Sequence, residues 1–118
     1  MKSVLFTLTI FLTIMAKKCN APKQGLLSCI SKRIEEIKKQ PQWNPPAEVY
    51  EYSYNGRRVF YFSSDCCDHY NTVVDENCNE VCAPSGGITG KGDGKCDDFK
   101  TNAKMVKLVW KDERTGTK

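Results

Sequence analysis

A short run of metal-ligating and nucleophilic residue types occupies positions 65–69, where the sequence is DCCDH. His69 is the only histidine in the chain, so any catalytic arrangement that needs an imidazole must use it. Thiolates, imidazoles and carboxylates are the ligands that zinc takes, and a thiolate is also a nucleophile. A metal-binding or thiol-redox protein centred on this cluster is therefore one hypothesis.

Cysteine chemistry favours another interpretation of the same cluster. A zinc site here would draw on Cys66, Cys67, Cys78 and Cys82. Such a site needs reduced thiols, whereas exported proteins keep their cysteines in disulfides. The chain has no CxxC redox motif, and the acid pair Asp75-Glu76 is adjacent and turn-forming, unlike a positioned acid and base. We therefore predict a protein that is not an enzyme and has no cofactor and no metal site.

The N-terminal stretch predicts export. Lys2 precedes an apolar run, residues 4–16, that only threonines interrupt. A membrane-spanning helix needs about 20 residues, so this shorter run fits the apolar region of a signal peptide. We predict a lipoprotein-type signal over residues 1–18, with Cys19 lipidated at the cell envelope. Secretion as a soluble product is the main alternative, since Lys18 stands where lipoprotein processing requires a small residue.

The charge of the chain excludes nucleic acid as an expected partner. Of the 18 lysines and arginines, Lys2, Lys17 and Lys18 precede Cys19, and none of the 14 acidic residues does. The formal net charge of +4 therefore falls to +1 for the chain from Cys19 onward. Nucleic-acid-binding domains carry a clustered basic face, and this sequence shows none.

The remaining cysteines predict a disulfide framework. An even number of cysteines in a small exported domain indicates disulfides. We expect three bridges, each contributing roughly 2–4 kcal/mol, with the pairing left open. Adjacent cysteines make a strained ring, so Cys66 and Cys67 are expected to tie two separate elements together. The six cysteines of the framework are Cys29, Cys66, Cys67, Cys78, Cys82 and Cys96.

Hydrophobic periodicity predicts one helix followed by a β-hairpin. Leu26, Ile30, Ile34 and Ile37 recur at helical spacing before Pro41. Asn55-Gly56 then separates two alternating segments within residues 49–62 and predicts a two-residue hairpin turn. In that register the tyrosines share one face of the hairpin. The other face holds Phe60 and Phe62, which we expect to pack against the helix.

Three further strands complete the predicted fold. Residues 70–74 and 78–82 flank a turn at 75–77. Residues 105–111 form an edge strand with Val106, Leu108 and Trp110 on one face. The fold class is α+β: one N-terminal helix packed on a small antiparallel sheet of four or five strands, stabilised by disulfides. The expected organisation is a signal peptide at 1–18, a linker at 19–25, one domain at 26–114 and a tail at 115–118.

Two surfaces are candidate binding sites. The first is the tyrosine side of the hairpin, because tyrosine is amphipathic and is favoured at interfaces. Its candidate residues are Tyr50, Tyr52, Tyr54 and Arg57. The alternative role of these tyrosines is to stabilise the sheet. The second is the glycine loop, residues 83–98 (APSGGITGKGDGKCDD), which lacks phosphate-loop and EF-hand spacing. Its successive amides could form an anion-binding nest, although a structural loop is favoured. The loop's candidate residues are Gly90, Gly92 and Asp93.

The chain resembles a family of small exported, often lipoprotein-like proteins of Bacteroidota-type bacteria, grouped as a domain of unknown function (family 6970). The resemblance covers residues 29–114. It implies an envelope or secreted location and no catalytic residue. The expected function is a noncatalytic binding module for an unknown envelope or extracellular ligand; a small secreted inhibitor is a further alternative. The motifs that carry the resemblance are WNPPA, DCCD, DENC and CAPSGGITGKGDGKC.

Overall fold

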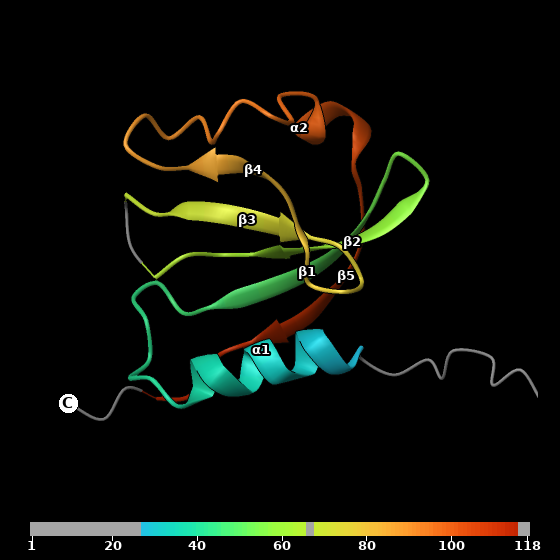
Figure 1. Cartoon of the computed structure of the whole chain (residues 1–118). Helices are drawn as coiled ribbons and strands as arrows, with labels where there is room; N and C mark the ends of the chain where they lie inside the picture. The colour runs from blue at the N-terminus through green and yellow to red at the C-terminus, as the bar shows by residue number, and fades with distance from the viewer. Residues whose placement is uncertain (1–26, 66–67, 116–118) are drawn as a thin grey trace, which may run out of the picture.

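Five antiparallel strands form one open sheet in the order β4-β3-β2-β1-β5. The structure is a computed structural model that describes residues 27–65 and 68–115. Figure 1 shows α1 on one side of the sheet and α2 with the glycine loop on the other. The predicted α+β class is confirmed. The elements in chain order are α1 (Ser28–Lys38), β1 (Glu48–Tyr54), β2 (Arg57–Phe62), β3 (Tyr70–Val74), β4 (Glu80–Gly86), α2 (Phe99–Asn102) and β5 (Lys104–Lys111).

The β1–β2 hairpin has the predicted turn and register. Asn55 and Gly56 take positive φ angles of 51° and 72°, as the two-residue turn with both central residues left-handed requires. Tyr50 lies directly opposite Tyr61. Because directly opposed residues share a face, this register gathers the tyrosines on one side of the sheet. We call that side the tyrosine face.

The other side of the sheet packs against α1. Ile30, Ile34 and Ile37 are buried at helical spacing and form one core with Phe60 and Phe62. Burying each large apolar side chain contributes about 1.5–3 kcal/mol. The expected pairing of the phenylalanine side with the helix is therefore confirmed, and it leaves the tyrosine face turned away from α1 (Figure 1).

A second, smaller core lies on the tyrosine face. Here α2 and the glycine loop cover part of the sheet (Figure 1). Helix α2 was not predicted from the sequence; it is only four residues long and follows Asp98 without a side-chain cap. The buried members of this core are Tyr54, Val59, Val73, Cys82, Cys96 and Phe99.

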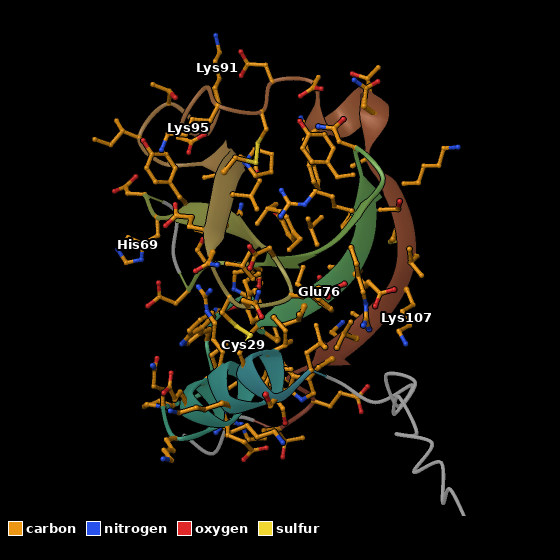
Figure 2. The ribbon with its side chains drawn as sticks, turned by 45° about the vertical axis from the view of Figure 1, so that its right-hand side comes forward. Cys29, His69, Glu76, Lys91, Lys95 and Lys107 are labelled. Carbon is orange, nitrogen blue, oxygen red and sulfur yellow. A yellow bond between two sulfur atoms is a disulfide. The ribbon has the colours of Figure 1, made fainter. Side chains whose placement is uncertain are left out.

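Two disulfides hold the loops to these cores. Cys29–Cys78 ties α1 to the turn between β3 and β4, and Cys82–Cys96 ties β4 to the segment before α2. The first of these bridges is drawn beside the label of Cys29 in Figure 2. These four cysteines pair with one another, so none of them forms the bridges expected from Cys66 and Cys67. Those two cysteines lie outside the described residues.

Strand β3 begins and ends where predicted, but β4 starts later than expected. The Asp75 carboxylate accepts hydrogen bonds from the backbone N–H groups of Asn77 and Asn79, both at 2.9 Å. Cys78 takes a positive φ of 63° within this turn. A left-handed residue does not continue a strand, so the return strand starts only at Glu80.

The last strand lies at the sheet edge as predicted, but its expected alternation is wrong. Trp110 lies opposite Val49, on the α1 side, whereas Leu108 lies opposite Tyr50, on the tyrosine face. Register shifts fall at two points along this pair of strands. Each shift by one residue moves the following side chains to the other face. Val106 and Leu108 are consequently about half exposed, at 55% and 48%.

The predicted signal peptide, the lipidation site Cys19 and the linker at 19–25 lie outside the described residues. Within residues 27–65 and 68–115, no helix has the length and apolar character needed to cross a bilayer. The two disulfides are typical of extracellular or otherwise exported proteins, since thiols stay reduced in the cytosol.

Candidate binding site on the tyrosine face

A cavity of about 590 Å³ opens on the tyrosine face. Its floor consists of Tyr50, Tyr52 and Tyr61, which come from the paired strands β1 and β2. Pro84 and Ser85 of β4 form one wall. The opposite wall comes from α2 and the start of β5, with Phe99, Lys100, Ala103 and Met105.

The tyrosine rings of the floor are tilted against one another rather than stacked in parallel. Neighbouring centroids lie 6.2–6.5 Å apart, and the ring planes meet at 59–61°. Tyr52 also contacts Phe99 at 5.0 Å between centroids. Tilted aromatic pairs at these distances are favourable, so the floor is held in shape before any ligand arrives.

Polar groups surround these rings at fixed positions. The Tyr50 hydroxyl donates a 2.7 Å hydrogen bond to Glu48 Oε2, and Lys111 Nζ lies 3.6 Å from Glu48 Oε1. On the other side, the hydroxyls of Tyr61 and Ser85 share a 3.2 Å hydrogen bond. The site therefore combines aromatic surface with hydroxyl and carboxylate groups, the mixture found in ligand pockets.

The hydroxyls of Tyr50 and Tyr52 remain protonated at neutral pH. The hydrogen bond to Glu48 raises the pKa of Tyr50, and burial adds to the effect. Burial is the main cause that raises the pKa of Tyr52, with a smaller contribution from Tyr61. Tyr50 therefore keeps the hydrogen that it donates to Glu48, and Tyr52 keeps a hydrogen that it can donate to a ligand.

Lys100 places an unpaired positive charge on the α2 wall. Among the described residues no carboxylate lies within ion-pair distance of its ammonium group, whereas Lys111 shares Glu48. The side chain of Lys100 is exposed at the mouth of the cavity. An anionic group bound in the cavity would find its partner here.

Two of the four predicted hairpin residues lie outside this cavity. Tyr54 is buried against Phe99 and donates its hydroxyl to Asp98 at 2.5 Å, so its side chain belongs to the core. Arg57 is exposed at the hairpin tip, 3.9 Å from Asp75. Tyr50 and Tyr52 are brought together as predicted, while Tyr54 and Arg57 are not part of the site.

The backbone amides of the loop's candidate residues, Gly90, Gly92 and Asp93, are engaged inside the loop itself. The amide of Gly90 donates to Gly87, that of Gly92 to Gly86, and that of Asp93 to Ala83, at 2.9–3.1 Å. A Cβ on Gly92 would lie 2.0 Å from the Ala83 carbonyl oxygen. These internal contacts support the structural role that was favoured for the loop, and Cys96 closes it through its disulfide.

The DCCDH cluster is described only in part. Asp65 Oδ1 lies 2.6 Å from His69 Nδ1, and Figure 2 shows the His69 side chain at the periphery of the molecule. Cys66 and Cys67 lie outside the described residues. Among the residues that the structure does describe, no three His, Cys, Asp or Glu side chains gather as a metal site would require.

Most residues of the cavity walls were not predicted from the sequence. Tyr61 could have been included, because the predicted register already placed it opposite Tyr50. Ser85, Lys100 and Met105 reach the site only because the sheet order and the short helix α2 bring distant segments together. No local pattern in the sequence indicates that arrangement.

Comparison with known proteins identifies one family. Residues 35–112, well over half of the chain, match the family described as Domain of unknown function (DUF6970). No curated protein and no solved structure matches the chain.

Proposed function

The chain belongs to the DUF6970 family, and we propose that it is an exported, noncatalytic binding module of the cell envelope. The observation that carries this proposal is the cavity floored by Tyr50, Tyr52 and Tyr61. Ligand sites are concave, mostly apolar and furnished with a few fixed polar groups. This cavity has all three properties.

Export and anchoring form the second part of the proposal. The apolar run at residues 4–16 supports a signal peptide, and the two disulfides agree with an oxidising compartment. In this proposal Cys19 carries the lipid that holds the domain at the membrane surface. The few residues between Cys19 and α1 would then keep the domain close to the membrane.

Binding is favoured over catalysis by the state of the cavity's carboxylate. Glu48 already accepts the hydrogen bond of Tyr50 and lies beside Lys111. Acid–base catalysis needs a group that is free to take or give a proton at the substrate. A carboxylate engaged in this way is better suited to orienting its neighbours.

Retention on native material tests the proposal. We would incubate purified envelope fractions with the wild-type protein or with Tyr52→Ala, wash them, and measure the protein that is retained. Circular dichroism first shows that both proteins are folded. The proposal expects Tyr52→Ala to lose most of its retention. Ile88→Ala is the matched control, since Ile88 is an apolar residue 92% exposed on the glycine loop and away from the cavity. Equal retention of all three proteins would refute binding through the tyrosine face.

The contact between Asp65 and His69 is the observation that favours one other function. A metal or thiol protein centred on the DCCDH cluster would contain reactive thiols or a stoichiometric metal. Intact-mass analysis of native protein, with and without thiol alkylation, distinguishes the two proposals. A lipid adduct on Cys19 without alkylation supports the anchored binding module, whereas alkylation of Cys66 or Cys67, or a retained metal, supports the alternative.

A further inference from the structure

We infer that the ligand of the tyrosine-face cavity is a saccharide that carries a carboxylate, such as a uronic acid unit of an envelope glycan. This inference rests on the proposed binding function and names its ligand class. Four features of the cavity point to this ligand class: its size, the arrangement of its rings, its hydroxyl groups and the charge on its wall.

The size of the cavity favours a small ligand over a protein surface. Pockets for small molecules measure about 300–1,000 Å³, and this one measures about 590 Å³. A stable protein interface buries roughly 800 Å² on each partner. The walls from β4 and α2 confine the aromatic floor, so a ligand of one or a few sugar units fits better than a flat protein face.

The ring geometry favours a puckered ligand over a planar one. No two of the three floor tyrosines are parallel, since their planes meet at 59–61°. A flat nucleobase between aromatic side chains needs parallel rings to stack on. A pyranose ring is puckered and presents C–H groups in several directions, so it can contact two tilted rings at once.

The hydroxyl groups of the site match the edge of a sugar. The hydroxyls of Tyr50 and Tyr61 are fixed by Glu48 and Ser85, and each oxygen still has acceptor capacity. The Tyr52 hydroxyl makes no hydrogen bond within the described part of the chain. Sugar hydroxyls both donate and accept, so they can bond to all of these groups without leaving a buried one unpaired.

The charge on the α2 wall indicates an anionic substituent. Lys100 has no carboxylate partner among the described residues, while the cavity's own carboxylate on Glu48 is already paired with Lys111. A neutral sugar would leave the Lys100 ammonium without a counter-charge. A carboxylated sugar, with its ring over Tyr52 and its carboxylate toward Lys100, satisfies both parts of the site.

Matched ligands separate the charge from the sugar. We would measure binding of short oligomers of galacturonate, glucuronate and mannuronate by calorimetry, each as the free acid and as its methyl ester. At least one free acid is expected to bind, and its methyl ester about tenfold more weakly, because a charge-assisted hydrogen bond is lost. Binding of the free acid should also weaken as salt rises.

Matched variants locate the contact. Lys100→Gln should weaken free-acid binding about tenfold and abolish the preference over the ester. Lys107→Gln is the control, because Lys107 lies opposite Glu51 on the α1 side of the sheet and projects from β5 in Figure 2. Tyr52→Phe, which keeps the ring, should bind more weakly than wild type and more strongly than Tyr52→Ala.

Two kinds of result would overturn the inference. Equal affinity for acid and ester, or a loss with Lys107→Gln as large as with Lys100→Gln, would overturn the carboxylate contact. Absence of binding to every oligomer would overturn the saccharide class. The retention assay with Tyr52→Ala then shows whether the binding function survives with a different ligand or fails as well.

Discussion

Arg114 holds the carboxylate of Asp112 through two hydrogen bonds, Nη2–Oδ2 at 2.7 Å and Nε–Oδ1 at 2.9 Å. The Asp112 residue is 2% exposed. The remaining nitrogen of the guanidinium, Nη1, donates to the backbone carbonyls of Lys38 at 2.8 Å and Gln40 at 3.0 Å. A cation at the C-terminal end of a helix satisfies its free carbonyls and its dipole. The pair therefore joins the end of the sheet to the end of α1.

Removing this guanidinium should loosen the contact between α1 and the sheet. We expect Arg114→Ala to lower Tm by about 4–8 °C, because the buried Asp112 carboxylate and the carbonyls of Lys38 and Gln40 lose the guanidinium that bonds them. Differential scanning calorimetry measures the change. Arg57→Ala is the control, since the Arg57 side chain is exposed and lies 3.9 Å from Asp75. An equal, small shift in both variants would show that the pair contributes no stability.

Acid should destabilise the fold through its hydrogen-bonded carboxylates, because the pKa values of Asp75, Asp98 and Asp112 are lowered in the folded chain. Hydrogen bonds from Arg114 hold the pKa of Asp112 below its ordinary value of 3.8, and the bond from Tyr54 does the same for Asp98. The unfolded chain therefore binds protons more readily at these sites than the folded chain does. The stability that these carboxylates contribute to the fold is fully present above pH 3.8. It is lost as the pH falls through the lower pKa values that they have in the folded chain.

The urea midpoint measured against pH tests this linkage. We expect a nearly constant midpoint from neutral pH to about pH 4 and a decline below it. Asp112→Asn should start from a lower midpoint and decline less steeply in acid, because one linked proton has been removed. A midpoint that stays constant down to pH 2 would contradict the assignment.

The two disulfides should differ in their contribution to stability. Cys29–Cys78 closes a separation of 49 residues, and Cys82–Cys96 closes one of 14. Constraint of the unfolded chain predicts losses of about 4 and about 3 kcal/mol when each bridge is removed. Urea unfolding of Cys29→Ser/Cys78→Ser and Cys82→Ser/Cys96→Ser measures both. A larger loss for the shorter loop would show that the buried packing of Cys82 and Cys96 outweighs chain entropy.

Local patterns predicted the parts of the fold that depend on neighbours in sequence. Asn55-Gly56 determined the hairpin turn and register, and the spacing of Ile30, Ile34 and Ile37 predicted α1. Both signals come from backbone preference and side-chain period, which act over a few residues. They were sufficient for the fold class and for placing the tyrosines together.

Non-local pairing accounts for what the sequence analysis missed. The faces of Leu108 and Trp110 depend on register shifts between β1 and β5, and these arise only when the strands meet. Tyr54 alternates with Tyr50 and Tyr52, yet Phe99 of α2 buries it. A period of two places all three tyrosines on one face but does not show which part of that face another element will cover.

This difference between the tyrosines gives a test of the site boundary. Tyr54→Phe removes the hydroxyl that bonds Asp98 and should lower Tm by less than about 4 °C, because the buried Tyr54 side chain loses the hydrogen bond that joins β1 to the start of α2. Retention on envelope material below the new Tm should be unchanged. Tyr50→Phe removes the hydroxyl that bonds Glu48 at the cavity. This variant should keep nearly the Tm of the wild type and lose retention on envelope material.

The reason is that the Tyr50 hydroxyl lies at the cavity edge, where solvent can replace it. Its removal should leave the free energy of unfolding within about 0.5 kcal/mol of wild type. Envelope retention should fall, because Glu48 loses the donor that orients it and the ligand loses its contact with the Tyr50 hydroxyl. Thermal scans and the retention assay measure the Tm and the retention of each variant. If Tyr54→Phe reduces retention as much as Tyr50→Phe while both remain folded, the site extends to the hairpin tip and the boundary drawn at Tyr52 is wrong.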